Sequence, residues 1–165
     1  MTPPRWRPMR ADDLPAVKIV SDAVHRDLPE RIEILDDKRA LFPDGAFVLE
    51  QDGALVGYAL AHPFPLGALP ALDTTIGAPP AGSDCLYLHD IALLPISRGH
   101  GAARRMVDML DEVAATHGLR ALALTSVYGT EPFWRSCGFA PVDAPDMADK
   151  LASYGGPAVY MARRV

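Results

Sequence analysis

The chain has 165 residues, of which 49% are hydrophobic and 22% are charged, the composition of an ordinary soluble globular protein. This length predicts a single domain over residues 1–165 with one substantial core. The formal net charge of -5 argues against nucleic acids and anionic membranes as partners, because an acidic surface favours neither.

The cysteines and the N-terminal segment bear on the cellular compartment. Cys85 and Cys137 lie far apart and form no CxxC pair, so we interpret them as buried free thiols, with a disulfide left open. The first ten residues contain no apolar core, and no apolar run reaches about 18 residues. We therefore expect no signal peptide, no membrane span and a cytoplasmic location.

The first half of the chain is expected to supply a strand, two helices and a hairpin. A short strand begins at Arg5, and Asp12 and Asp13 cap a helix that runs from about Leu14 to Val24. A weaker helix is expected over about Glu30–Ala40. Residues 45–64 form two β-type runs joined by a glycine-containing turn, which predicts a hairpin.

Residues 85–165 are expected to alternate strands and helices. The apolar run over residues 85–94 indicates a central strand buried on both faces. An amphipathic helix follows from about Gly101 to His117, and its crossover would place the next strand, residues 120–127, parallel to the first. A short helix near Pro132–Cys137 and strands within 138–142 and 157–165 follow, the last closing the sheet. The fold class is therefore α/β with a mixed sheet.

The stretch ISRGHGAARRMVDML, residues 96–110, opens a helix with two glycines, each of which costs about 1 kcal/mol relative to alanine. A strand end, a turn with Pro95 and a helix start aim free backbone N–H groups and the positive helix end at one point. Such a point binds an anion, above all a phosphate or pyrophosphate. Glycines would let this anion approach without a Cβ in the way.

Three phosphate-binding motifs compete for this stretch. A Walker loop needs a Lys after the second glycine, and none is present. Gly99 and Gly101 match the first two glycines of the dinucleotide-binding motif G-x-G-x-x-G, but Arg104 stands at the position of its third glycine. The pattern R-x-x-G-x-A is met by Arg98, Gly101 and Ala103, after a strand that ends in IALLP. This arrangement resembles the acetyl-CoA pyrophosphate loop of the GNAT superfamily of N-acetyltransferases.

The resemblance covers nearly the whole chain, because RPMRADDLPAV and EPFWRSCGFAP are similar to the opening and late segments of that family. It implies a GNAT-like mixed, mostly antiparallel central sheet with a splayed parallel strand pair, flanked by helices. It also implies acetyl-CoA as co-substrate, with pantetheine on the backbone of Ile91, Ala92 and Leu93. The pyrophosphate would bind the amides of Arg98, Gly99, His100, Gly101, Ala102 and Ala103.

The resemblance further implies direct transfer of an acetyl group to a primary amine of a small molecule or peptide. The acceptor ammonium must lose a proton before it attacks, and the departing thiolate needs a proton or a dipole. His89 is the candidate base, because imidazole titrates near neutral pH. Strand alternation places it on the same side as Tyr87 and Ile91. A core histidine is the alternative, and Asp90 would then be the base or attract a cationic acceptor.

The general acid departs from the family pattern. Trp134 stands where the family often has a tyrosine, and an indole N–H is no useful acid. Phe133 and Trp134 are therefore expected to be packing residues. Tyr128, Tyr154 or water would protonate the thiolate.

Acceptor, partners and alternative functions are less constrained by the sequence. The proline-rich loop Pro63–Asp84, with His62 and Phe64, is expected to shape the acceptor pocket as a lid. Members of the family often dimerise, which leaves both a monomer and a homodimer open. A non-catalytic acyl-CoA-binding sensor or interaction module is the alternative function, whereas a structural adaptor fits the anion loop poorly. No metal is expected, because metal-ligand spacing is missing around His25, His62 and His117.

Overall fold

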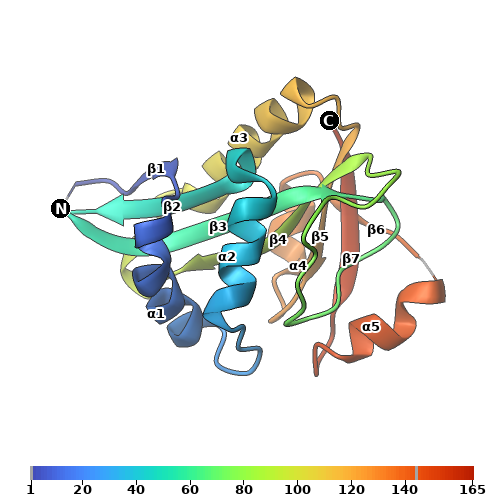
Figure 1. Cartoon of the computed structure of the whole chain (residues 1–165), viewed down its shortest axis with the longest axis horizontal. Helices are drawn as coiled ribbons and strands as arrows, with labels where there is room; N and C mark the ends of the chain where they lie inside the picture. Colours follow the sequence, from blue (N-terminus) through green and yellow to red (C-terminus); the bar gives the residue numbers. More distant parts are fainter. Residues whose placement is uncertain (1, 144) are drawn as a thin grey trace.

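The computed structural model describes residues 2–143 and 145–165 and places a seven-stranded sheet at its centre (Figure 1). The strand order is β1-β2-β3-β4-β5-β7-β6. Every neighbouring pair is antiparallel except β4 and β5, which run parallel. This arrangement confirms the predicted mixed, mostly antiparallel sheet with one parallel pair.

The first half of the chain has the expected strands and helices, but the expected cap of its first helix is wrong: Asp12 and Asp13 lie in a 3₁₀ turn, and the Asp13 carboxylate pairs with Arg7 instead of capping the helix. Its elements are β1 (Arg5–Pro8), α1 (Leu14–Val24), α2 (Ile32–Leu41), β2 (Ala46–Gln51) and β3 (Ala54–Phe64). Helix α2 begins two residues after the expected start at Glu30, so Glu30 lies in the connection between α1 and α2. Two 3₁₀ turns, Ala11–Asp13 and Pro43–Gly45, precede α1 and β2.

The second half adds two elements to the expected series. It contains β4 (Cys85–Leu93), α3 (Ala102–Thr116), β5 (Ala121–Ser126), α4 (Glu131–Ser136), β6 (Ala140–Pro141) and β7 (Val159–Arg164). The additional elements are a 3₁₀ turn over Pro145–Met147 and α5 (Ala148–Ala152); a further 3₁₀ turn, Pro95–Ser97, follows β4. The last strand does not close the sheet in space. It lies between β5 and β6, because it pairs with β5 along six residues and with β6 along two.

Helices cover both faces of the sheet (Figure 1). On one face, α1 and α2 pack on β2 and β3 through a cluster that includes Leu14, Val17, Leu35, Val48 and Leu60. On the other face, α3 and α4 pack through a larger cluster that includes Leu86, Leu88, Met106, Leu110 and Trp134. Cys85 and Cys137 are buried free thiols, as interpreted from the sequence. Within the described residues, none of the helices combines the length and apolar character that crossing a membrane requires.

Strand β4 is buried on both faces only over Cys85–Leu88, which corrects the expectation for the whole strand. Its pairing with β5 also ends at Leu88, opposite Leu124, although β4 continues to Leu93. The second half of β4 therefore has a free edge, and most of its residues are partly exposed.

A β-bulge in β4 corrects the expected alternation of its side chains. Leu60 and Ala61 are adjacent in β3, yet they lie opposite Asp90 and Leu88 of β4. His89 is the extra residue between these two positions. An extra residue on one strand shifts the facing of every residue that follows it.

The bulge places His89 and Asp90 on the same face of the sheet. The His89 ring lies 6.3 Å from the ring of Tyr87, on the expected side. Asp90 contacts residues of the α1 side, as described below. Ile91 packs against the cluster of Leu88 and α3, so the expectation that it shares a side with His89 is wrong.

Candidate functional site

The separation of β4 from β5 opens a cleft with a volume of about 560 Å³. One wall comes from the free half of β4, including Ile91 and Leu93, and the opposite wall comes from the end of β5 and from α4. The titratable side chains in its lining are His25, His89, Asp90, Arg98 and Tyr128. The residues expected for catalysis and for the pantetheine arm thus meet at one cleft, apart from Ala92, which is buried in the α1 cluster.

The glycine-containing loop after β4 lies at one end of this cleft. Gly99 and Gly101 have φ angles of 83° and 73°, in the left-handed region that favours glycine. Gly101 is the N-cap of α3. In the described ranges, the backbone N–H groups of residues 99–104 donate to no protein acceptor. A second concavity of about 450 Å³ lies over this loop, which fits an anion held by main-chain donors.

Arg98 differs from the rest of the predicted anion-binding set. Its backbone N–H donates to the Pro95 carbonyl at 3.2 Å, and its Nε donates to the Leu93 carbonyl at 3.1 Å. The Arg98 amide is therefore already paired, and the run of unpaired amides begins at Gly99.

Contacts from the N-terminal segment hold the loop in place. Arg105 donates from one guanidinium nitrogen to the His100 carbonyl and from the other to the Pro4 carbonyl. The Trp6 indole N–H donates to the Ala102 carbonyl at 2.9 Å. These contacts fix the backbone of the loop, whereas the His100 side chain is exposed.

His89 is paired with a carboxyl group that the sequence analysis missed. Its Nε2 lies 3.0 Å from Oε1 of Glu30, and the two side chains are only 3% and 7% exposed. The Nδ1 atom of His89 has no hydrogen-bond partner within the described residues. A neutral imidazole that donates from Nε2 to Glu30 carries its basic lone pair on Nδ1. His89 is thus a buried histidine with one nitrogen uncommitted.

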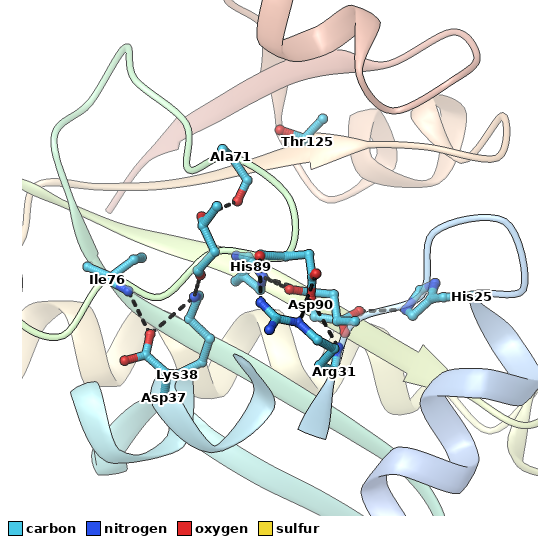
Figure 2. Close-up of polar contacts among 12 residues, drawn as sticks. His25, Arg31, Asp37, Lys38, Ala71, Ile76, His89, Asp90 and Thr125 are labelled. Atoms are coloured by element: carbon cyan, nitrogen blue, oxygen red, sulfur yellow. Dashed lines mark hydrogen bonds and ion pairs between the residues drawn. The ribbon is translucent and has the colours of Figure 1, made fainter. Parts of the chain in front are cut away.

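Asp90 is engaged on both of its oxygens. Oδ1 lies 2.6 Å from Nε2 of His25, and Oδ2 accepts a hydrogen bond from the Tyr58 hydroxyl. Figure 2 shows His25 reaching Asp90 from the end of α1, beside His89. Burial alone would raise the pKa of Asp90, but the nearby His25 and the two hydrogen bonds lower it overall. These contacts favour an ionised Asp90 that holds its neighbours.

Tyr128 is an exposed residue in the lining of the cleft. It is 51% exposed, and its hydroxyl lies 3.2 Å from Nδ1 of His25. Trp134 is buried, and its indole N–H donates to Oγ1 of Thr130. Its ring packs edge-to-face on Phe133, in agreement with a packing role for both residues.

A smaller cavity of about 50 Å³ adjoins the cleft and shares His25, His89 and Asp90 with it. Glu30 and Tyr154 also line it. The carboxyl groups of Glu30 and Asp90 thus both lie in the wall of this small cavity. The proline-rich segment contributes Leu72 to this cavity.

His62 and Phe64 line neither space, which differs from their expected place in the acceptor pocket. His62 is fully buried, and burial lowers its pKa to about 3.

Helix α2 holds the proline-rich segment against the site (Figure 2). Asp37 accepts backbone hydrogen bonds from Ile76 at 2.7 Å and from Gly77 at 3.1 Å. The buried Lys38 ammonium donates to the Thr74 carbonyl at 2.7 Å. Because the segment is fixed at several points, it is an ordered cover beside the small cavity. No group of three or more potential metal ligands occurs among the residues that the structure describes.

Comparison with known proteins identifies the fold. Residues 9–139 match the model of the acetyltransferase (GNAT) family. A search of the curated proteins found no significant match to this sequence.

Solved structures resemble the chain over nearly its full length. The loading GNATL domain of CurA from Lyngbya majuscula is 15% identical, with a TM-score of 0.77 and 99% of this chain and 98% of that chain covered. A GphF GNAT-like decarboxylase in complex with isobutyryl-CoA is 18% identical, with a TM-score of 0.76 and 97% and 98% covered. Naa50 of Arabidopsis thaliana, in complex with the bisubstrate analogue CoA-Ac-MVNAL, is 12% identical, with a TM-score of 0.69 and 98% and 99% covered.

Proposed function

The chain belongs to the acetyltransferase (GNAT) family, and we propose that it transfers an acetyl group from acetyl-CoA directly to a primary amine of a small molecule or peptide. The observation that carries this proposal is that the unpaired loop amides, the free edge of β4 and the side chains of His89, Asp90 and Tyr128 meet at one cleft. The first two features suit a CoA ester, and the third suits proton transfer at its thioester.

The cofactor half of the proposal depends on the backbone. The amides of residues 99–104 and the positive end of α3 would hold the pyrophosphate, since main-chain donors and the helix dipole both favour negative charge. The free edge of Ile91 and Leu93 would bind the amide groups of the pantetheine arm like an added strand. Naa50 and the GphF decarboxylase were solved with CoA derivatives, which supports an acyl-CoA in this fold.

We assign the general base to His89 and an orienting role to Glu30. The hydrogen bond from Nε2 to Glu30 would keep the lone pair of the buried, unpartnered Nδ1 free to take the ammonium proton through one water. Asp90 is the poorer base, because both of its oxygens are engaged and its pKa is lowered. We assign protonation of the thiolate to Tyr128, an exposed residue in the cleft lining whose hydroxyl would take the place of the tyrosine missing at Trp134.

The acceptor would bind as a cation before it loses its proton. Glu30 and Asp90 both line the small cavity, and carboxyl groups in a confined space attract an ammonium group. Leu72 of the proline-rich segment lies at the same cavity, which gives this segment a part in acceptor choice.

The proposal is tested by incubating the protein with acetyl-CoA and a panel of primary amines that includes small aliphatic amines and peptides with free N-termini. We expect amine-dependent release of CoA thiol, with the acetylated amine detected by mass spectrometry. His89→Gln should lower kcat/KM by roughly 100-fold, within the range of general-base catalysis, and leave CoA affinity nearly unchanged. His117→Gln is the matched control, because His117 also pairs with a carboxylate, Asp44, but lies outside the cleft.

Two results would count against the proposal. CoA binding without turnover of any amine would favour the alternative, a non-catalytic acyl-CoA-binding module. Full activity of His89→Gln would make His89 a core histidine and return the role of base to Asp90 or to water. Because a neighbouring structure is a decarboxylase, the required readout is the acetylated amine itself and not CoA binding.

A further inference from the structure

Four side chains from four separate parts of the fold form a continuous chain of hydrogen bonds. Tyr58 of β3 donates to Asp90 of β4, and Asp90 pairs with Nε2 of His25 at 2.6 Å. His25 follows α1, and its Nδ1 lies 3.2 Å from the hydroxyl of Tyr128, which follows β5. His25 and Tyr128 also stack, with ring centroids 5.8 Å apart and planes inclined by 20°.

The chain runs from the core to the open cleft. Tyr58 is fully buried, the side chains of Asp90 and His25 are 8% and 14% exposed, and Tyr128 is 51% exposed. Tyr128, the last member, is therefore the most exposed of the four and the one best placed to give a proton to a group in the cleft. A chain of hydrogen bonds that runs from the core to the surface can pass a proton from its buried members to its exposed end.

Several groups favour a protonated His25. The residue is the C-cap of α1, where the negative end of the helix dipole stabilises a cation. Burial lowers the pKa of His25, but the charge and hydrogen bond of Asp90 outweigh it, with a smaller contribution from Glu30, and the net pKa is raised. The groups that face His25 are thus Asp90 from β4, Glu30 from the α1–α2 connection and Tyr128 from the β5–α4 turn.

We infer that His25 is a positioning residue that holds the Tyr128 hydroxyl in the cleft and returns a proton to it in each catalytic cycle. The inference rests on the proposed acetyl transfer. The acceptor amine, which has already given one proton to His89, forms a bond from its nitrogen to the acetyl carbon, and the bond between that carbon and the CoA sulfur breaks. The nitrogen then gives its second proton to solvent, which leaves a neutral amide. The thiolate takes the phenolic proton of Tyr128, and the phenolate takes the Nδ1 proton of His25. His25 stays neutral with its Nε2 proton on Asp90 until solvent protonates Nδ1 again.

This arrangement explains how Tyr128 can act although its own pKa is raised, first by burial and then by Asp90. A phenol alone would be left as a phenolate near two carboxyl groups. Transfer of a proton from the imidazolium removes that charge, and the remaining hydrogen bond between neutral His25 and Asp90 keeps the ring in place.

The kinetic test compares wild type with His25→Gln, Tyr128→Phe and the double variant, each with acetyl-CoA and an accepted amine. Each single variant should lower kcat by roughly tenfold to 100-fold, and the double variant should fall no further than Tyr128→Phe. In wild type, kcat should decline as pH rises through the pKa of His25, because the imidazolium is then lost. His25→Gln should remove that limb while the KM for acetyl-CoA and the unfolding midpoint stay near their wild-type values.

An NMR titration of the His25 ring supplies a readout that does not require turnover. We expect His25 to titrate above about 6.5, the value of a free histidine. His117→Gln is the control for loss of a histidine that contacts a carboxylate, Asp44, outside the cleft, and it should keep full kcat.

The possible failures are distinguishable. Wild-type turnover with an unchanged kcat in His25→Gln overturns this inference alone, as do additive effects in the double variant or a His25 that titrates below 6.5. Absence of amine acetylation by the wild type refutes the proposed function and, with it, the inference.

Discussion

Replacement of Gly101 by alanine tests the anion loop with a change of one methyl group. Gly101 has a φ of 73°, a conformation that costs an L-residue about 1–2 kcal/mol. A Cβ built there meets only Nη1 of Arg105, at 3.5 Å, which is ordinary van der Waals contact. The fold should therefore survive, with the melting temperature lowered by roughly 2–8 °C for a chain of this size.

The same Cβ would stand on the surface where the pyrophosphate is expected to bind. Loss or lengthening of one charge-assisted hydrogen bond costs about 1.5–3 kcal/mol, or roughly a tenfold to 100-fold rise in the Kd for CoA. Isothermal titration calorimetry with CoA measures this rise, and thermal unfolding measures the change in stability.

Gly53 provides a matched control for the strain. It has a φ of 79°, lies in the turn between β2 and β3, and would place its Cβ in open space. Gly53→Ala should lower stability as much as Gly101→Ala but leave CoA affinity unchanged. An unchanged Kd in folded Gly101→Ala, or an equal loss in Gly53→Ala, would refute a pyrophosphate site at this loop.

Three further predictions follow from buried contacts. His62 has a pKa of about 3 in the folded protein and near 6.5 in the unfolded chain, so the unfolded state binds one more proton as the pH falls. The free energy of unfolding, measured by urea titration, should therefore fall by roughly 2 kcal/mol between pH 8 and pH 5. His62→Gln should flatten this pH dependence, and an unchanged dependence in the variant would contradict the prediction. Asp37→Asn weakens the hydrogen bonds that anchor the proline-rich segment, and should raise the acceptor KM roughly fivefold with CoA affinity unchanged in calorimetry. A weaker CoA affinity with an unchanged acceptor KM would mean that the segment serves CoA. Trp134→Phe loses the hydrogen bond to Thr130, and should lower the free energy of unfolding by about 1–2 kcal/mol in chemical denaturation with little change in kcat/KM. Loss of activity without loss of stability would contradict a packing role for Trp134.

The sequence predicted most of the fold because its strongest signals are local. The amphipathic period of α3, the glycines at its start, and the two β-type runs joined by a glycine-containing turn at β2 and β3 are each read from a short stretch of sequence. Helix α5 was not predicted, because its five residues carry too little periodicity. The position of β7 between β5 and β6 was not predicted either, since pairing partners depend on contacts across the whole chain.

The parts of the candidate site that consist of backbone could be predicted from the sequence more readily than the parts where side chains from distant segments meet. The loop at Gly99 and Gly101 follows from the two glycines themselves. The bulge at His89 depends on the register between β3 and β4, so simple alternation misplaced Ile91. His25 and Glu30 lie 65 and 59 residues before the partners they contact, and nothing local marks them as members of the site.

Direct transfer of acetyl from acetyl-CoA to an amine in the cleft between β4 and β5 can be measured as an acetyl balance. The protein is incubated with isotopically labelled acetyl-CoA and an accepted amine, and thiol, acetylated amine, free acetate and labelled protein are all quantified. Direct transfer predicts one labelled acetyl on the amine for each thiol released, with none on the protein. Thiol released with the label in acetate or on the protein, or label retained on CoA with every amine, would contradict it.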